Sequence, residues 1–128
     1  MVTVLERDGL LERLTAAAAT GMTPAVWASI QPDKVSVYDP NGRSHTFAQI
    51  NANANRLARL FRQHGLKAGE AVALVCSNRH EFVEVLAAAH RTGARITPVN
   101  WHLRTDQLGY IVRDCEAKVL IGDARAGG

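Results

Sequence analysis

The clearest pattern in the chain is an apolar stripe at helical spacing in its middle third. Thr46 precedes this segment, and Gln49 three residues later completes a capping box at its start. Gly65 is typical of a residue that ends a helix. The pattern therefore predicts a helix between Thr46 and Gly65, with one face turned to a core. The members of the stripe, at steps of four, three and four residues, are Ile50, Ala54, Leu57 and Phe61.

Beyond this helix, apolar runs alternate with segments of helical character. The run 71–76 is apolar without interruption, which predicts a strand buried on both faces of a parallel sheet. Residues 95–99 and 118–121 predict two further strands. We expect the intervening helices to begin at Asn78 and Thr105, which act as N-caps. The residues of the first of these helices that we expect to face the sheet are Phe82, Val83 and Leu86.

The N-terminal part predicts helices followed by a β-hairpin. Pro24 suits the first position of a short helix, which Trp27 and Ile30 are expected to anchor. Residues 39–42 read Asp-Pro-Asn-Gly, a sequence typical of a tight reversal. The predicted elements are an Ala-rich helix over 10–19, a helix capped by Thr23, and strands over 35–38 and 44–46.

These elements predict an α/β fold, in which an N-terminal β-hairpin and helices are followed by a βαβαβ unit with a parallel sheet. We divide the chain into an N-terminal helical segment over 1–31, an α/β subdomain over 32–123, and a flexible end over 124–128.

Composition and charge exclude several classes of protein. The 128 residues are 47% hydrophobic and 21% charged, as in an ordinary globular domain. The formal net charge of +3 is spread along the chain, so no nucleic-acid partner is predicted. Arg56, Arg59 and Arg62 recur at helical spacing, and we interpret them as a solvated helix face.

Targeting signals and cysteine chemistry are not evident either. No apolar run approaches the ~18 residues that span a bilayer, so no membrane span is predicted. Charged residues interrupt every N-terminal stretch that could serve as a secretory signal, and we expect a cytoplasmic protein. Cys76 and Cys115 lie far apart in apolar contexts, which indicates reduced thiols and no structural metal.

Ligands of open α/β sheets bind beyond the carboxyl ends of the strands, which here means residues 77–80, 100–104 and 122–123. No G-x-G-x-x-G follows a strand and no G-x-x-x-x-G-K-[ST] is present, so neither a dinucleotide fold nor a P-loop is predicted. Near Arg104, Trp101 and His102 form either a cationic mouth for a phosphate or an exposed loop with one packed Trp.

The other histidines offer less chemistry. Cys76 and His80 are the only local pair of a thiol and a base, but Cys76 falls in the apolar strand and reads as an inert core thiol. His45, His64 and His90 are interpreted as turn or helix-end residues. We therefore assign no catalytic residue and no metal ligand.

An ordered series of short strings resembles the N-terminal part of the adenylate-forming acyl-CoA synthetases, a branch of the AMP-binding superfamily that includes fatty-acid–CoA ligases. The resemblance extends over about 32–123, and no single string is diagnostic. The strings are 46–50 (TFAQI), 55–58 (NRLA), 65–73 (GLKAGEAVA), 78 with 81–82, 91–94 (RTGA), 98–100 (PVN) and 114–121 (DCEAKVLI).

The resemblance implies an acid-thiol ligase that activates a carboxylate with Mg-ATP to an acyl-adenylate and transfers the acyl group to coenzyme A. The family's phosphate loop, adenine-contacting motif, Mg-binding Glu, ribose-binding Asp and C-terminal lysine would all lie beyond Gly128. We expect the chain to be an N-terminal piece that is not catalytic alone and binds none of these cofactors. The remainder of the synthetase is its implied partner, and self-association through an exposed sheet edge is expected.

The loop after the second predicted parallel strand departs from the family at one residue. Relatives read Asn-Pro-Arg-Leu or Asn-Trp-Arg-Leu after the second parallel strand, and their Arg lies near the phosphates of the CoA nucleotide. Here the loop reads Asn100-Trp101-His102-Leu103, so His102 or Arg104 would make that contact. The resemblance thus implies CoA-side binding residues Asn100, Trp101, His102 and Arg104. A stand-alone α/β binding or interaction module of the same topology is the alternative.

Overall fold

The computed structural model describes residues 4–124, with side chains from Gly9 onward. Most of the end predicted to be flexible, 125–128, lies outside the described residues. Within them, no helix is long and apolar enough to cross a bilayer. The elements are α1 (Val4–Ala18), α2 (Thr23–Ile30), β1 (Val35–Tyr38), β2 (Ser44–Thr46), α3 (Phe47–Gln63), β3 (Ala71–Val75), α4 (His80–Thr92), β4 (Arg95–Val99), α5 (Thr105–Asp114) and β5 (Ala117–Gly122).

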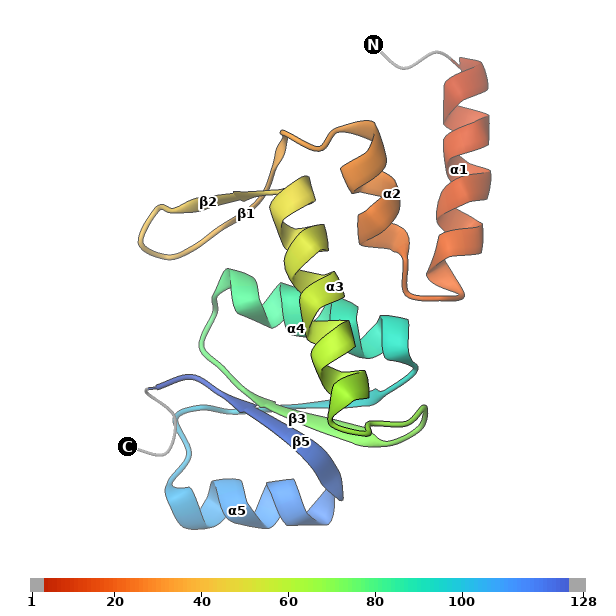
Figure 1. The fold of residues 1–128 in the computed structure, drawn as a ribbon. Coiled ribbons are helices and arrows are strands. Elements are labelled where there is room, and N and C mark those ends of the chain that lie inside the picture. The colour runs from red at the N-terminus through yellow and green to blue at the C-terminus, as the bar shows by residue number, and fades with distance from the viewer. Residues whose placement is uncertain (1–3, 125–128) are drawn as a thin grey trace.

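The predicted α/β fold is confirmed: β1 and β2 form an antiparallel hairpin, and the other strands form a parallel sheet in the order β4-β3-β5. The chain leaves β3 through α4 to reach β4, then returns past β3 through α5 to reach β5. Figure 1 shows α3 and α4 on one face of the sheet and α5 on the other.

Strand β3 is buried on both faces, as its uninterrupted apolar run predicted. Val72 and Leu74 join the core between the sheet and the α3–α4 layer. Val75 packs on the opposite face with Val99 and Leu108 of α5. A strand enclosed by helices on both sides excludes water from both of its faces, so it has no position for a polar side chain.

The capping box of α3 is present. The Thr46 hydroxyl accepts a hydrogen bond from the Gln49 N–H at 3.2 Å, and the Gln49 side-chain oxygen accepts one from the Thr46 N–H at 2.9 Å. The stripe behind it is buried, except that Leu57 is only partly so. The buried residues of α3 are Ile50, Ala54, Ala58 and Phe61.

Two predicted N-caps are wrong by one residue. Thr23 and Thr105 are the first helical residues of α2 and α5, and the N-caps are Met22 and Arg104. In α5 the Gln107 side-chain oxygen accepts a hydrogen bond from the Arg104 N–H at 3.0 Å, which ties the helix start to Arg104. The Gln107 side chain therefore fixes Arg104, and not Thr105, as the N-cap of α5.

Helix α4 also differs from its prediction. Its N-cap is Arg79 and not Asn78, and its first helical residue, His80, is held by a residue far away in sequence. Phe82 is half-buried against the core, and Val83 and Leu86 are only partly covered. Because α4 contacts both the sheet and α3, its buried arc is broad and made mostly of small residues. The buried residues are Glu84, Val85, Ala87, Ala88 and Ala89.

Of the N-terminal helices, α2 packs against α3, and α1 packs against α2. Trp27 is half-buried with its ring 6.2 Å from that of Phe47, whereas Ile30 is 40% exposed and does not anchor α2 as predicted. Gly21, between α1 and α2, has a φ of +70°. A Cβ there would lie 2.6 Å from the backbone carbon of His90, so only glycine lets this turn press against the end of α4.

Candidate functional site

A pocket of about 670 Å³ opens at the carboxyl ends of β3 and β4. The chain turns toward opposite faces of the sheet after these neighbouring strands, to α4 after β3 and to α5 after β4. Such a switch point leaves a crevice between the two loops, where ligands of open α/β sheets bind. The lining residues are Asp39, Pro40, Asn41, Arg43, Ser77, Asn78, Arg79, His80, Glu81, Trp101 and His102.

The structure brings some of the predicted binding residues into this pocket. Trp101 and His102 line it, with their ring centroids 3.7 Å apart. Asn100 shapes the loop, because its side-chain oxygen accepts a hydrogen bond from the His102 N–H at 3.0 Å. Arg104 is not among the lining residues, and its guanidinium pairs with exposed Asp106 at 3.2 Å.

The third strand-end loop is tied to the first. The Ser77 hydroxyl donates to the Asp123 carboxylate at 2.5 Å, and Arg79 lies 3.7 Å from the same carboxylate. Arg79 also pairs with Glu81 at 3.0 Å. These contacts hold the loops after β3 and β5 together, so the wall of the pocket formed by Ser77 and Arg79 is braced from behind.

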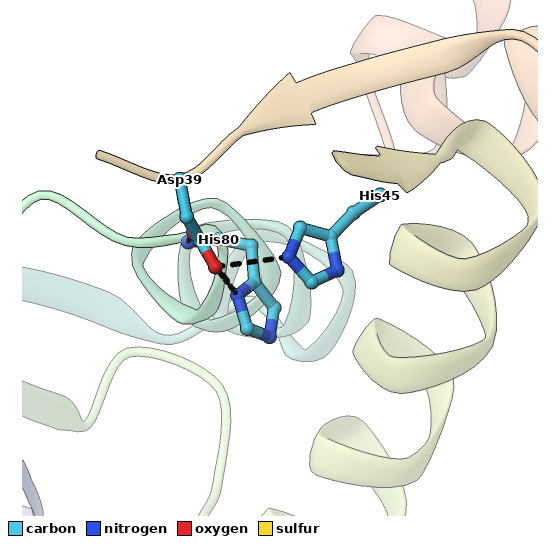
Figure 2. A group of neighbouring side chains, drawn as sticks. All are labelled: Asp39, His45 and His80. Carbon is cyan, nitrogen blue, oxygen red and sulfur yellow. Dashed lines mark hydrogen bonds and ion pairs between the residues drawn. The ribbon is translucent and has the colours of Figure 1, made fainter. Parts of the chain in front are cut away.

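The hairpin turn supplies the remaining wall, and with it a cluster of ionisable side chains. Oδ2 of Asp39 lies 3.0 Å from Nε2 of His45 and 2.9 Å from Nδ1 of His80. The two imidazole rings stack with centroids 3.6 Å apart. Figure 2 shows both rings turned toward the one carboxylate. Asp39 Oδ1 also accepts the backbone N–H of His80 at 2.8 Å, so the hairpin caps the start of α4.

Burial and hydrogen bonding act in opposite directions on the Asp39 carboxyl. Burial favours its neutral form, but hydrogen bonds from His45 and from the backbone and ring of His80 outweigh burial and lower its pKa from 3.8 to about 2. The carboxylate is therefore charged at neutral pH. At the start of α4 this negative charge also meets the positive end of the helix dipole.

Two neighbouring groups have raised pKa values. Burial raises the pKa of the Cys76 thiol, and the charges of Asp123 and Glu81 add to this effect, in line with an inert core thiol. Burial also raises the pKa of Glu84, against the hydrogen bond that its carboxylate accepts from Asn53 at 2.9 Å.

The Asp39 cluster is not evident from the sequence. Asp39 lies in the predicted turn. His45 lies inside strand β2, as the predicted strand over 44–46 requires, and not at a turn or helix end, the position to which its own interpretation assigned it. Local spacing in the sequence pairs His80 only with Cys76. Asp39 and His80 are 41 residues apart, so no local pattern joins them. The sequence offered one indication of the cluster, namely that Asp39, His45 and His80 are all residue types that can bind metals or protons.

Comparison with known proteins gives the class. A family model described as AMP-binding enzyme matches residues 25–127. The 2-succinylbenzoate–CoA ligase of Geobacillus kaustophilus is 35% identical over 79% of this chain and 20% of its own length. Human long-chain fatty acid transport protein 1 is 35% identical over 71% of this chain and 14% of its own length. The chain belongs to the AMP-binding enzyme family.

The fold agrees with that assignment. A fatty acyl CoA synthetase of Mycobacterium tuberculosis superposes with a TM-score of 0.77 at 30% identity, over 85% of this chain and 22% of that one. The chain thus spans about a fifth or less of the relatives that it matches. The N-terminal domain of FACL13 from Mycobacterium tuberculosis superposes over 84% of this chain and 27% of that domain, so the chain resembles an N-terminal part of these enzymes, as the ordered strings predicted.

Proposed function

We propose that this chain is the N-terminal section of an ATP-dependent acyl-CoA synthetase, which converts a carboxylate to an acyl-adenylate and then to an acyl-CoA. The observation that carries the proposal is the family match over residues 25–127, together with relatives whose printed names are CoA ligases. The section contributes the sheet β4-β3-β5 and the wall of a pocket. Its partner is the remainder of the synthetase, and its compartment is the cytoplasm.

The described residues do not suit Mg-ATP at the pocket. No glycine lines it, so it lacks the flexible backbone that wraps a triphosphate. Its buried carboxylate, Asp39, faces two imidazole rings, whereas Mg²⁺ prefers oxygen ligands and water. In this proposal the nucleotide is bound by other parts of the synthetase, and the 128-residue chain forms no acyl-adenylate.

The same proposal gives the loop after β4 a role on the CoA side. Trp101 offers a flat apolar surface, and His102 offers an imidazole beside it in the pocket. Asn100 holds the loop in shape. Arg104 contributes less than the resemblance implies, because Asp106 offsets its charge. Arg43 lines the pocket and supplies positive charge for a phosphate in its place, whereas the charge of Arg79 is offset by Glu81 and Asp123.

The purified 128-residue chain is expected to release no pyrophosphate from ATP with any carboxylic acid, and to show no saturable ATP binding at micromolar concentration in calorimetry. The matched control is an intact synthetase assayed in parallel. Saturable micromolar ATP binding by the chain would contradict the proposal and favour a self-sufficient module.

Mass spectrometry of the protein as made in its source tests the other half of the proposal. The expected product carries these residues at the start of a chain several times longer. If the source makes only the 128-residue species, the proposed partner does not exist in the same polypeptide.

A further inference from the structure

We propose that Asp39, His45 and His80 bind one divalent transition-metal ion of the zinc class, which joins the β1–β2 hairpin to the start of α4. Each residue offers one donor atom, and the three donor atoms lie within 4.8 Å of one another. They come from the hairpin turn, from β2 and from the first residue of α4. Three chain segments therefore converge on one point.

The donor-atom separations suit a small ion once the two stacked imidazole rings, whose centroids lie 3.6 Å apart, turn about their Cβ–Cγ bonds so that both in-plane lone pairs point at one ion. Zinc bonds of about 2.0–2.1 Å in a tetrahedral site place neighbouring donor atoms roughly 3.3 Å apart. Oδ2 of Asp39 is 3.0 Å from Nε2 of His45 and 2.9 Å from Nδ1 of His80. A separation larger by a few tenths of an ångström would admit the ion, which takes the place of the protons between the rings and the carboxylate.

A fourth donor stands beside these three. Oε2 of Glu81 is shielded from solvent and accepts no hydrogen bond from the described residues. It lies 3.2 Å from Nδ1 of His80. A buried carboxylate oxygen without a hydrogen-bond donor is costly unless a cation or proton compensates it. A metal ion bound by His80 would supply that compensation.

Charge and donor type set the class of ion. Two imidazole nitrogens with carboxylate oxygens suit Zn²⁺, Cu²⁺, Ni²⁺ or Co²⁺, whereas Mg²⁺ and Ca²⁺ prefer oxygen alone. The carboxylate of Asp39 balances one positive charge, and that of Glu81, which it shares with Arg79 at 3.0 Å, balances part of a second. Buried Glu84 lies 3.9 Å from Nε2 of His80. These acidic groups also offset the positive end of α4, which by itself would repel a cation.

The ion would lie in the wall of the pocket to which the proposed function assigns CoA binding. The metal site does not depend on that function. Asp39, His80 and Glu81 all line the pocket wall. Their fixation by a metal would hold the hairpin turn against the loop after β3. The role is structural, since no reacting group is placed at the ion.

The test is calorimetric titration of ZnCl₂ into the 128-residue chain after treatment with EDTA and dialysis. We expect one Zn²⁺ per chain and no saturable Mg²⁺ binding. H45Q and H80Q should each lower the affinity by more than about tenfold. H64Q, which changes an exposed histidine at the end of α3, should leave it unchanged.

A second measurement uses the unmutated chain, so it does not require that the variants fold. In the NMR spectrum of the unmutated chain, Zn²⁺ should shift the ring resonances of His45 and His80 and leave those of His64 in place. The absence of saturable Zn²⁺ binding would overturn the proposal. It would equally be overturned by an unchanged affinity in both H45Q and H80Q, or by resonance shifts confined to other residues.

Discussion

At the scale of single residues, Asp39 joins parts of the chain that are distant in sequence. Its carboxylate accepts hydrogen bonds from His45, from the His80 ring and from the first N–H of α4. These bonds lower its pKa to about 2, so folding favours the charged form. A carboxyl whose pKa is lowered in the folded state stabilises the fold above its unfolded pKa and loses that effect in acid.

We predict that the free energy of unfolding of the metal-free chain falls as the pH drops from the unfolded value of 3.8 toward about 2, and that Asp39 contributes to this fall. In D39N the stability at neutral pH should be lower and the acid-dependent loss smaller. Urea unfolding at a series of pH values, in EDTA, measures both. D33N changes an exposed carboxyl and serves as the control. Parallel pH profiles for D39N and the unmutated chain would contradict the prediction.

At the scale of elements, polar residues join α3 to α4 inside an otherwise apolar contact. The Arg91 guanidinium donates to the side chain of Asn55 at 2.7 Å and to that of Asn51 at 2.6 Å. Burial lowers the pKa of Arg91. Asn51 and Asn55 are one helical turn apart, so both point toward the same place on α4.

We predict that R91M destabilises the chain by about 1.5–3 kcal/mol, because it leaves two half-buried amide oxygens without their charged donor. R62M, on the exposed side of α3, should change stability by less than about 0.5 kcal/mol. Urea unfolding measures the difference, and a double-mutant cycle with N55A isolates the contact. A coupling energy indistinguishable from zero would mean that Arg91 and Asn55 do not interact in solution.

At the scale of the whole molecule, the parallel sheet has two open sides. β4 and β5 each pair only with β3 among the described residues. Leu120 of β5 is 57% exposed and lines an apolar groove of about 410 Å³ with Val112 and Leu108 of α5. Unpaired strand edges beside apolar surface favour pairing with another strand.

We predict that the isolated chain self-associates through the β5 edge of the sheet, and that the interface buries more than about 1,000 Å² in total. L120K, which places a charge on the edge strand, should weaken association, and L11K, at an exposed position on α1, should not. Sedimentation equilibrium over a wide concentration range measures the mass. A constant mass near 13.9 kDa for the unmutated chain would contradict the prediction.

Local pattern by itself determined the kinds of elements and their order. The capping box of Thr46 and Gln49, the apolar stripe of α3 and the continuous apolar run of β3 are all encoded by residues within a few positions of one another. Short-range sterics, hydrogen bonding and water exclusion act over those distances, which is why these predictions are confirmed. The short strings that resemble the acyl-CoA synthetases also depend on local sequence, because each string belongs to one element and the strings follow the order of the elements along the chain.

Tertiary structure alone decided the Asp39 cluster and the polar contacts between α3 and α4. Asp39 meets His80 because the hairpin folds against the start of α4, and Glu84 and Arg91 find Asn53 and Asn55 because α3 packs on α4. The same packing overturned the predicted cap at Asn78, since a carboxylate 41 residues away from His80 satisfies the helix start instead. Contacts between distant segments depend on how elements pack in three dimensions, and the periodicity of one element carries no information about its neighbour's polar groups.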